Sequence, residues 1–257
     1  MANDTARSLP RSVFVADDLS YWKIAGDPST VDLLNDHDAM ILPYSAEPEV
    51  NEAEVTRVRA LIDAAGQLSR DALLVRNPYA EHGYAFADHA IAEFSAAKYR
   101  ALAQVAGLLG ATSIAVREVK IEHSKRTWAA GIRAALKVGK GDAEATREVK
   151  QKVENSLKGR FTFDGGPADV VAAQEFLRRR QLTADQQLVD LLEMRSGKYT
   201  IRSYHMTIDG IREADANFKA AVNLANAGPV KILGVGATFS QTVSNLSRIE
   251  IEIEIEF

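Results

Sequence analysis

The most regular pattern in the chain is a strict alternation of apolar and charged residues over Ser247–Phe257. Its apolar side holds Ile249, Ile251, Ile253, Ile255 and Phe257, and its charged side holds Glu250, Glu252, Glu254 and Glu256. A period of two residues is typical of a β-strand with one buried face, and isoleucine favours such a pleated surface. We therefore predict a strand of an antiparallel sheet here, with Val230–Ser240 as its hairpin partner.

Alternating segments recur through the second half of the chain. They predict strands at Ile114–Ser124, Thr127–Gly139, Arg160–Phe163 and Lys198–Asp209. In the first of these strands the alternation slips once, because Ile114 and Val116 share one parity while Val119 and Ile121 share the other. A slip of one residue is what a β-bulge produces.

Helical spacing dominates the first half, where apolar residues recur every three or four positions. It predicts helices at about Asn51–Gly66 and Asp88–Gly110, with short strands at Ser12–Ala16, Ala39–Pro43 and Ala72–Val75. The second half adds helices at Asp142–Leu157, from Pro167, from a Thr183–Gln186 capping box to Gly197, and at Ile211–Ala225.

These elements predict the fold class α+β, with an antiparallel sheet of long strands in the C-terminal half packed against helices from both halves. No low-complexity linker interrupts the chain. We therefore expect a single α+β domain over residues 1–257, with a flexible arm at 1–11, a helix-rich half at 12–110 and a strand-rich half at 111–257.

Composition narrows the picture only in part. Hydrophobic residues make up 46% of the 257 residues and the formal net charge is -4, so charge alone gives no support to nucleic-acid binding. The chain has no cysteine, which excludes disulfides and thiolate chemistry. It also lacks an apolar signal segment and any apolar run of about 18 residues, so we expect a cytoplasmic protein.

Candidate ligand-binding residues are aromatic or histidine side chains in the loop Asn77–Phe86 and in two of the predicted strands. They are Tyr79, His82, Tyr84, His123, Tyr204 and His205. Loops of this kind often carry function, and His123 would approach His205 if their strands are neighbours. The alternative is that the loop simply covers the sheet and that the histidines are ordinary surface groups. No motif points to a metal or a cofactor, so we expect neither.

Two charged features are candidate interaction sites. The four glutamates Glu250, Glu252, Glu254 and Glu256 stack at intervals of about 7 Å on one face of their strand. A neighbouring basic strand would relieve their repulsion, and the candidates are Lys120, Arg133, Lys137, Arg202 and Lys231. The second feature is the helix-terminal cluster Arg178, Arg179 and Arg180, which suits either a solvated helix end or an anionic partner.

The absence of a catalytic signature and the long regular strands favour a non-catalytic protein that acts through self-assembly, as a homo-oligomer, or through a protein partner. In outline, long antiparallel strands with inserted helices resemble gasdermin-type pore formers, although no motif in the chain is specific to that family. A membrane-active assembly is a special form of this hypothesis, because Thr127–Gly139 alternates apolar and polar residues over a length that suits a bilayer-crossing β-strand. The glutamates would then face a water-filled lumen. The alternative hypothesis is an enzyme or small-ligand binder with a pocket between the helical half and the sheet.

Overall fold

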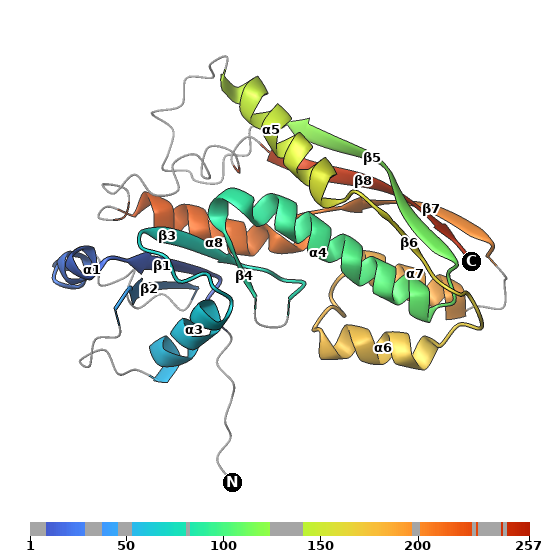
Figure 1. Cartoon of the computed structure of the whole chain (residues 1–257), viewed down its shortest axis with the longest axis horizontal. Helices are drawn as coiled ribbons and strands as arrows, with labels where there is room; N and C mark the ends of the chain where they lie inside the picture. Colours follow the sequence, from blue (N-terminus) through green and yellow to red (C-terminus); the bar gives the residue numbers. More distant parts are fainter. Residues whose placement is uncertain are drawn as a thin grey trace, which may run out of the picture. The chain divides into compact units, whose positions relative to one another are not determined.

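The structure, a computed structural model, describes residues 9–28, 38–45, 53–80, 83–123, 141–196, 201–227, 230, 243 and 246–257. Within these residues the fold is α+β, with helices and two four-stranded sheets that are mostly antiparallel (Figure 1). One of the sheets lies in the C-terminal half, so the predicted fold class is confirmed.

The elements fall into two compact units, each assembled from distant parts of the sequence. The first comprises Met1–Asn77, His82–Ala90 and Asp215–Gln241, and the second comprises Pro78–Glu81, Ile91–Ala214 and Thr242–Phe257. Neither unit coincides with the predicted halves 12–110 and 111–257. The single-domain organisation stays a prediction.

The first unit contains a sheet with the strand order β2-β1-β3-β4. Its strands are β1 (Ser12–Ala16), β2 (Ala39–Pro43), β3 (Ala72–Arg76) and β4 (Tyr84–Phe86). β1 and β2 run parallel, and helix α1 (Asp18–Ala25) lies between them in sequence, while the other pairs are antiparallel. β4 corrects the prediction of an uninterrupted loop over Asn77–Phe86, where aromatic and turn residues outnumber those of the short strand.

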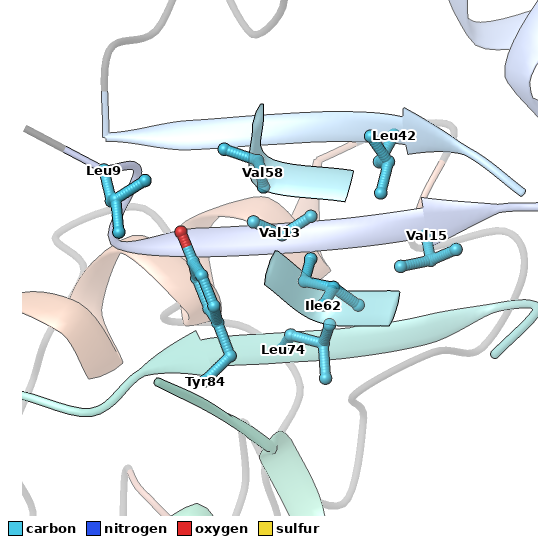
Figure 2. Packing of buried hydrophobic residues seen from close by; sticks show 8 residues of the cluster. All are labelled: Leu9, Val13, Val15, Leu42, Val58, Ile62, Leu74 and Tyr84. Atoms are coloured by element: carbon cyan, nitrogen blue, oxygen red, sulfur yellow. The ribbon is translucent and has the colours of Figure 1, made fainter. Parts of the chain in front are cut away.

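The core of the first unit forms where helix α3 (Ala53–Ala64) packs on this sheet. Val58 and Ile62 lie one helical turn apart and are fully buried against side chains from the strands (Figure 2). This spacing of four residues places both side chains on one face of the helix. Helix α8 (Asp215–Asn226) contacts β1, β2 and β3.

The predicted flexible arm is wrong for residues 9–11. Leu9 is a member of the core cluster and is 5% exposed. Its carbonyl accepts a hydrogen bond from Arg76 Nη1 at 2.9 Å, and the carbonyl of Pro10 accepts one from the Tyr84 hydroxyl at 2.9 Å. These bonds to β3 and β4 fix the chain before β1 begins.

The second unit contains an antiparallel sheet with the strand order β6-β5-β8-β7. Its strands are β5 (Ser113–His123), β6 (Arg160–Thr162), β7 (Ser203–Asp209) and β8 (Leu246–Glu256). β8 is central, since Glu250–Glu256 pairs with β5 on one side and β7 on the other. The predicted hairpin partner Val230–Ser240 is therefore wrong for this stretch, and apart from Val230 it lies outside the described residues.

The predicted bulge in β5 is confirmed. Val116 pairs with Ile253 of β8 and Glu118 pairs with Glu252, so Arg117 is an extra residue to which the β5–β8 register gives no opposite residue. The bulge restores the alternation that the sequence interrupts, because Ile114 and Val119 then point to the same buried side.

Helices α4 (Ala87–Leu108), α5 (Gly141–Ser156), α6 (Val170–Arg179) and α7 (Gln186–Ser196) complete the second unit, with α4 entering it at Ile91. Two predicted helix starts need correction. The Asp169 side chain caps α6, in place of a start at Pro167. Asp185 Oδ1 accepts from the backbone N–H groups of Gln187 and Leu188, so Asp185 takes the role predicted for Thr183.

The predicted strand Thr127–Gly139 lies outside the described residues, so the membrane-active form of assembly stays a prediction. In the part of the chain that the structure describes, none of the helices is long and apolar enough to span a membrane.

Candidate functional site

The isoleucine face of β8 is the buried side of the second sheet. Ile249, Ile251, Ile253 and Ile255 are each at most 1% exposed. From α4, the Tyr99 hydroxyl donates to the carbonyl of Ile114 at 3.2 Å, and its ring lies 5.5 Å from that of Phe161 on β6. Burial raises the pKa of Tyr99 to about 12. This face of the sheet is therefore packed core.

The glutamate face is paired with basic side chains from the neighbouring strands of the same sheet. Glu252 contacts Lys120, and Glu254 contacts both Arg117 and His205 Nε2, the latter at 3.4 Å. Glu256 Oε2 lies 2.7 Å from Arg160 Nη2. These contacts confirm that basic side chains of the same sheet lie beside three of the four glutamates, and the interaction role of the glutamates stays a prediction.

Only one of the predicted basic neighbours of the glutamates is among those observed. Lys120 is confirmed, whereas Arg133, Lys137 and Lys231 lie outside the described residues. Arg202 makes no ion pair with a glutamate among the described residues, and its carbonyl accepts from Phe257 N. Arg117 and Arg160 were missed for two reasons. Arg117 is the bulge residue, and the alternation of the sequence does not reveal how its side chain is oriented. Arg160 reaches the row of glutamates because β6 pairs with β5 at Ala115.

The open side of β7 is defined by two backbone hydrogen bonds at its ends. Phe257 N donates to Arg202 O and Gly210 N donates to Ile249 O, both at 2.8 Å. In an antiparallel strand the backbone groups of alternate residues point to the same side. The even-numbered residues therefore bond to β8, and the odd-numbered residues turn their N–H and C=O groups away from it. The latter are Ser203, His205, Thr207 and Asp209.

A glutamine side chain from α7 occupies one end of this open side. Gln187 Nε2 donates to Thr207 O at 2.8 Å, and Gln187 Oε1 accepts from Asp209 N at 3.2 Å. The side-chain amide thus replaces a peptide group of a neighbouring strand. No partner on this side is seen for the backbone of Ser203 or His205 among the residues described, and the His205 side chain is 68% exposed.

β7 is the most open of the strands that end the two described sheets. It has seven residues, against five in β2 and three each in β4 and β6. Exposed edges are commonly protected by lysine, proline, bulges or short length. The sequence of β7 contains neither lysine nor proline, and its register with β8 is uninterrupted. Among the described residues, the side chain of Gln187 protects this edge by bonding to two of its backbone groups.

Behind Gln187 lies a buried cluster of charged and polar groups around Lys98 of α4. The Lys98 side chain is 0% exposed. Its Nζ lies 2.7 Å from Glu213 Oε2, 3.2 Å from Asp185 Oδ2 and 2.9 Å from Gln187 Oε1. The Tyr79 hydroxyl donates to the same Glu213 carboxylate. The cluster holds the amide of Gln187 in the orientation that bonds to β7.

The electrostatics of this cluster follow from burial. Two carboxylates, Asp185 and Glu213, share one ammonium group, and burial raises the pKa of Asp185 although Lys98 opposes the shift. Burial and the Glu213 charge also raise the pKa of Tyr79 above its ordinary value, so the phenol stays protonated as a donor. Within the described ranges, no group of three potential metal ligands comes together.

Lys98 carries a signal that sequence reasoning missed. It lies four residues after Phe94 and four before Leu102, on the apolar stripe that predicts the buried face of this helix. A lysine at such a position is buried only when partners neutralise its charge and accept its hydrogen bonds. The identity of those partners has no local signal, because Gln187 is 89 residues away and Glu213 is 115 residues away.

Tyr79 and Tyr84, the predicted ligand-binding tyrosines of the first half, bond to different parts of the fold. Tyr79 bonds to Glu213 in the second unit, whereas Tyr84 bonds to Pro10 in the first. Both are 5% exposed. His82 and the side chain of His123 lie outside the described residues, so the proposed ligand pocket stays a prediction.

The predicted approach of His123 to His205 is wrong, because β8 separates their strands. His123 pairs with Leu246 and His205 pairs with Glu254. These partners are eight residues apart on β8, or about 26 Å at 3.3 Å per residue. Tyr204 and His205 lie instead on the open edge strand β7.

The arginine cluster ends α6. Arg178 and Arg179 lie in its last turn and are exposed, and Arg180 follows as the C-terminal cap. Arg180 also lies with its guanidinium carbon 5.9 Å from the ring centre of Phe176. This placement suits the favourable interaction of cations with a helix C-terminus, and the interaction role stays a prediction.

Comparison with known proteins adds no family. No protein-family model matches the chain, and neither a curated protein nor a solved structure matches it.

Proposed function

We propose that this protein acts without catalysis, through self-assembly or through a protein partner, and that the open side of β7 is where a strand of the second protein is added. The observation that carries this proposal is the pair of outward-facing, exposed residues Ser203 and His205 on a regular edge strand. Strand addition is an established mode of recognition, in which main-chain hydrogen bonds supply affinity.

The rest of the second sheet supports this assignment. The isoleucine face is core, and three of the four glutamates have basic partners from within the sheet. The edge of β7 therefore offers backbone groups that a second chain can satisfy, while neither face of β8 requires a partner.

Replacing His205 with proline tests the proposal. The His205 N–H points away from β8, so His205→Pro removes an outward donor and leaves the bonds between β7 and β8 intact. We expect wild-type protein to form an assembly, seen by light scattering coupled to size exclusion, and His205→Pro to shift that assembly to monomer. Circular dichroism should show that the variant is folded.

A second variant acts in the opposite direction. Gln187→Ala exposes Thr207 O and Asp209 N and so lengthens the open edge, which should raise the assembled fraction. Self-assembly through β7 is wrong if the folded wild type, His205→Pro and Gln187→Ala remain monomeric at every accessible concentration. It is also wrong if all three form the same assembly.

A further inference from the structure

Among the residues that the structure describes, the backbone groups of Ser203 and His205 have no partner on the outer side of β7. Ser203 and His205 each turn one N–H and one C=O outward. On one side of them Thr207 O is taken by Gln187, and on the other Ile201 O accepts from Arg195 Nη1 at 3.2 Å. The open stretch is thus two outward-facing residues with Tyr204 between them.

We infer that the strand added to this edge is β7 of a second copy of the chain, running antiparallel with Tyr204 opposite the partner's Tyr204. This inference rests on the proposed function and names its partner. An interface of this kind is isologous, because the same patch serves both copies.

The register follows from matching donors to acceptors. With Tyr204 at the two-fold axis, Ser203 lies opposite the partner's His205, and His205 lies opposite the partner's Ser203. Each of these pairs exchanges two N–H···O bonds, as hydrogen-bonded pairs of an antiparallel ladder do. All the open groups of Ser203 and His205 in both copies are then satisfied.

The neighbouring register is disfavoured by Gln187. A two-fold axis at His205 would place Ser203 opposite the partner's Thr207. The Thr207 carbonyl already accepts a hydrogen bond from the Gln187 amide, which occupies the place of the incoming strand. Gln187 therefore both protects the edge and selects its register.

The side chains are compatible with the Tyr204 register. Tyr204 turns its backbone toward β8, so across the interface it forms a non-hydrogen-bonded pair, in which side chains are closest. The other face places His205 beside the partner's Ser203, a small neutral residue. This arrangement puts no two carboxylates of the two β7 strands directly opposite each other.

Single cysteines test the register, because the chain has none of its own. Across a non-hydrogen-bonded pair the Cα atoms are about 4.5 Å apart, within the usual range of about 4.4–6.8 Å for disulfides. Under mild oxidation Tyr204→Cys should form a dimer on a non-reducing gel, and reductant should reverse it. Ser203→Cys and His205→Cys, each alone, are matched controls that should remain mostly monomeric.

Mixing the two control proteins keeps the test independent of Tyr204. Ser203→Cys combined with His205→Cys should cross-link, because these residues face each other between copies. Cross-linking of His205→Cys with itself, but not of Tyr204→Cys, would overturn this register. If neither Tyr204→Cys nor the mixture cross-links while wild type still forms an assembly that His205→Pro dissolves, β7 binds a different segment and only this inference fails. Monomeric wild type with no cross-link would end this inference together with the self-assembly form of the proposed function.

Discussion

Asp185 serves two partners with its two carboxylate oxygens. Oδ1 caps α7 by accepting from Gln187 N and Leu188 N at 3.1 and 3.4 Å, and Oδ2 pairs with Lys98. The residue is 2% exposed, so its charge is costly to bury and its pKa is raised above the ordinary 3.8. Asp185 therefore makes folding stability depend on pH.

Replacement of Asp185 with asparagine should remove this dependence. Because the folded-state pKa is raised, the folded protein binds more protons than the unfolded chain, and the residue's contribution to the free energy of unfolding grows as pH falls through that pKa. Each unit of the shift corresponds to about 1.4 kcal/mol. Relative to Asp185→Asn, wild type should gain stability as pH is lowered toward about pH 4 in urea titrations. A difference that does not change with pH would contradict the assignment.

Ile251 and Glu252 show how the two faces of strand β8 differ. Ile251 is fully buried between Val119 of β5 and Ile208 of β7, whereas Glu252 is 39% exposed and pairs with Lys120 on the outer face. The two residues are adjacent in sequence, so their substitutions are matched for position in the sheet.

Ile251→Ala should lower the free energy of unfolding by about 2–5 kcal/mol, because it removes buried methyl groups and leaves a cavity. Glu252→Gln should cost less than about 1 kcal/mol, because exposed ion pairs are weak in water. Urea titration of both variants measures the difference. Equal losses would show that the glutamate face contributes to stability as much as the core face.

The sequence predicted most elements because their signals are local. β1 and β2 match the predicted bounds, and the slip within Ile114–Ser124 marks the bulge at Arg117. β4 was missed because its three residues lie in a segment of aromatic and turn residues that is typical of a loop. The partner of β8 was wrong because alternation defines the faces of a strand and carries no information about the strand beside it.

At the scale of the whole molecule, the proposed β7 interface and the two charged interaction sites predict different responses to salt. Backbone hydrogen bonds join groups without net charge, so assembly through β7 should persist when salt is raised. Binding through the glutamate ladder or Arg178–Arg180 should weaken, because the screening length falls from about 10 Å at 0.1 M to about 3 Å at 1 M salt.

Sedimentation velocity at low and high salt distinguishes these surfaces. We expect the same assembled fraction in both buffers for wild type, and monomer in both for His205→Pro. Dissociation of the wild-type assembly at high salt would assign the contact to the charged residues and not to the edge of β7.

The sequence by itself determined which residues of β5 and β8 face the core, because alternation and the slip within Ile114–Ser124 are properties of a few consecutive residues. The sequence also places Lys98 on the apolar stripe of α4, but it does not show which residues pair with the buried ammonium group. Tertiary structure decided that β8 lies between β5 and β7, that Arg117 and Arg160 pair with the glutamates, and that Gln187 bonds to Thr207 and Asp209 at one end of the β7 edge. Those contacts join residues that are distant in sequence, and no local period records which distant segment supplies the partner.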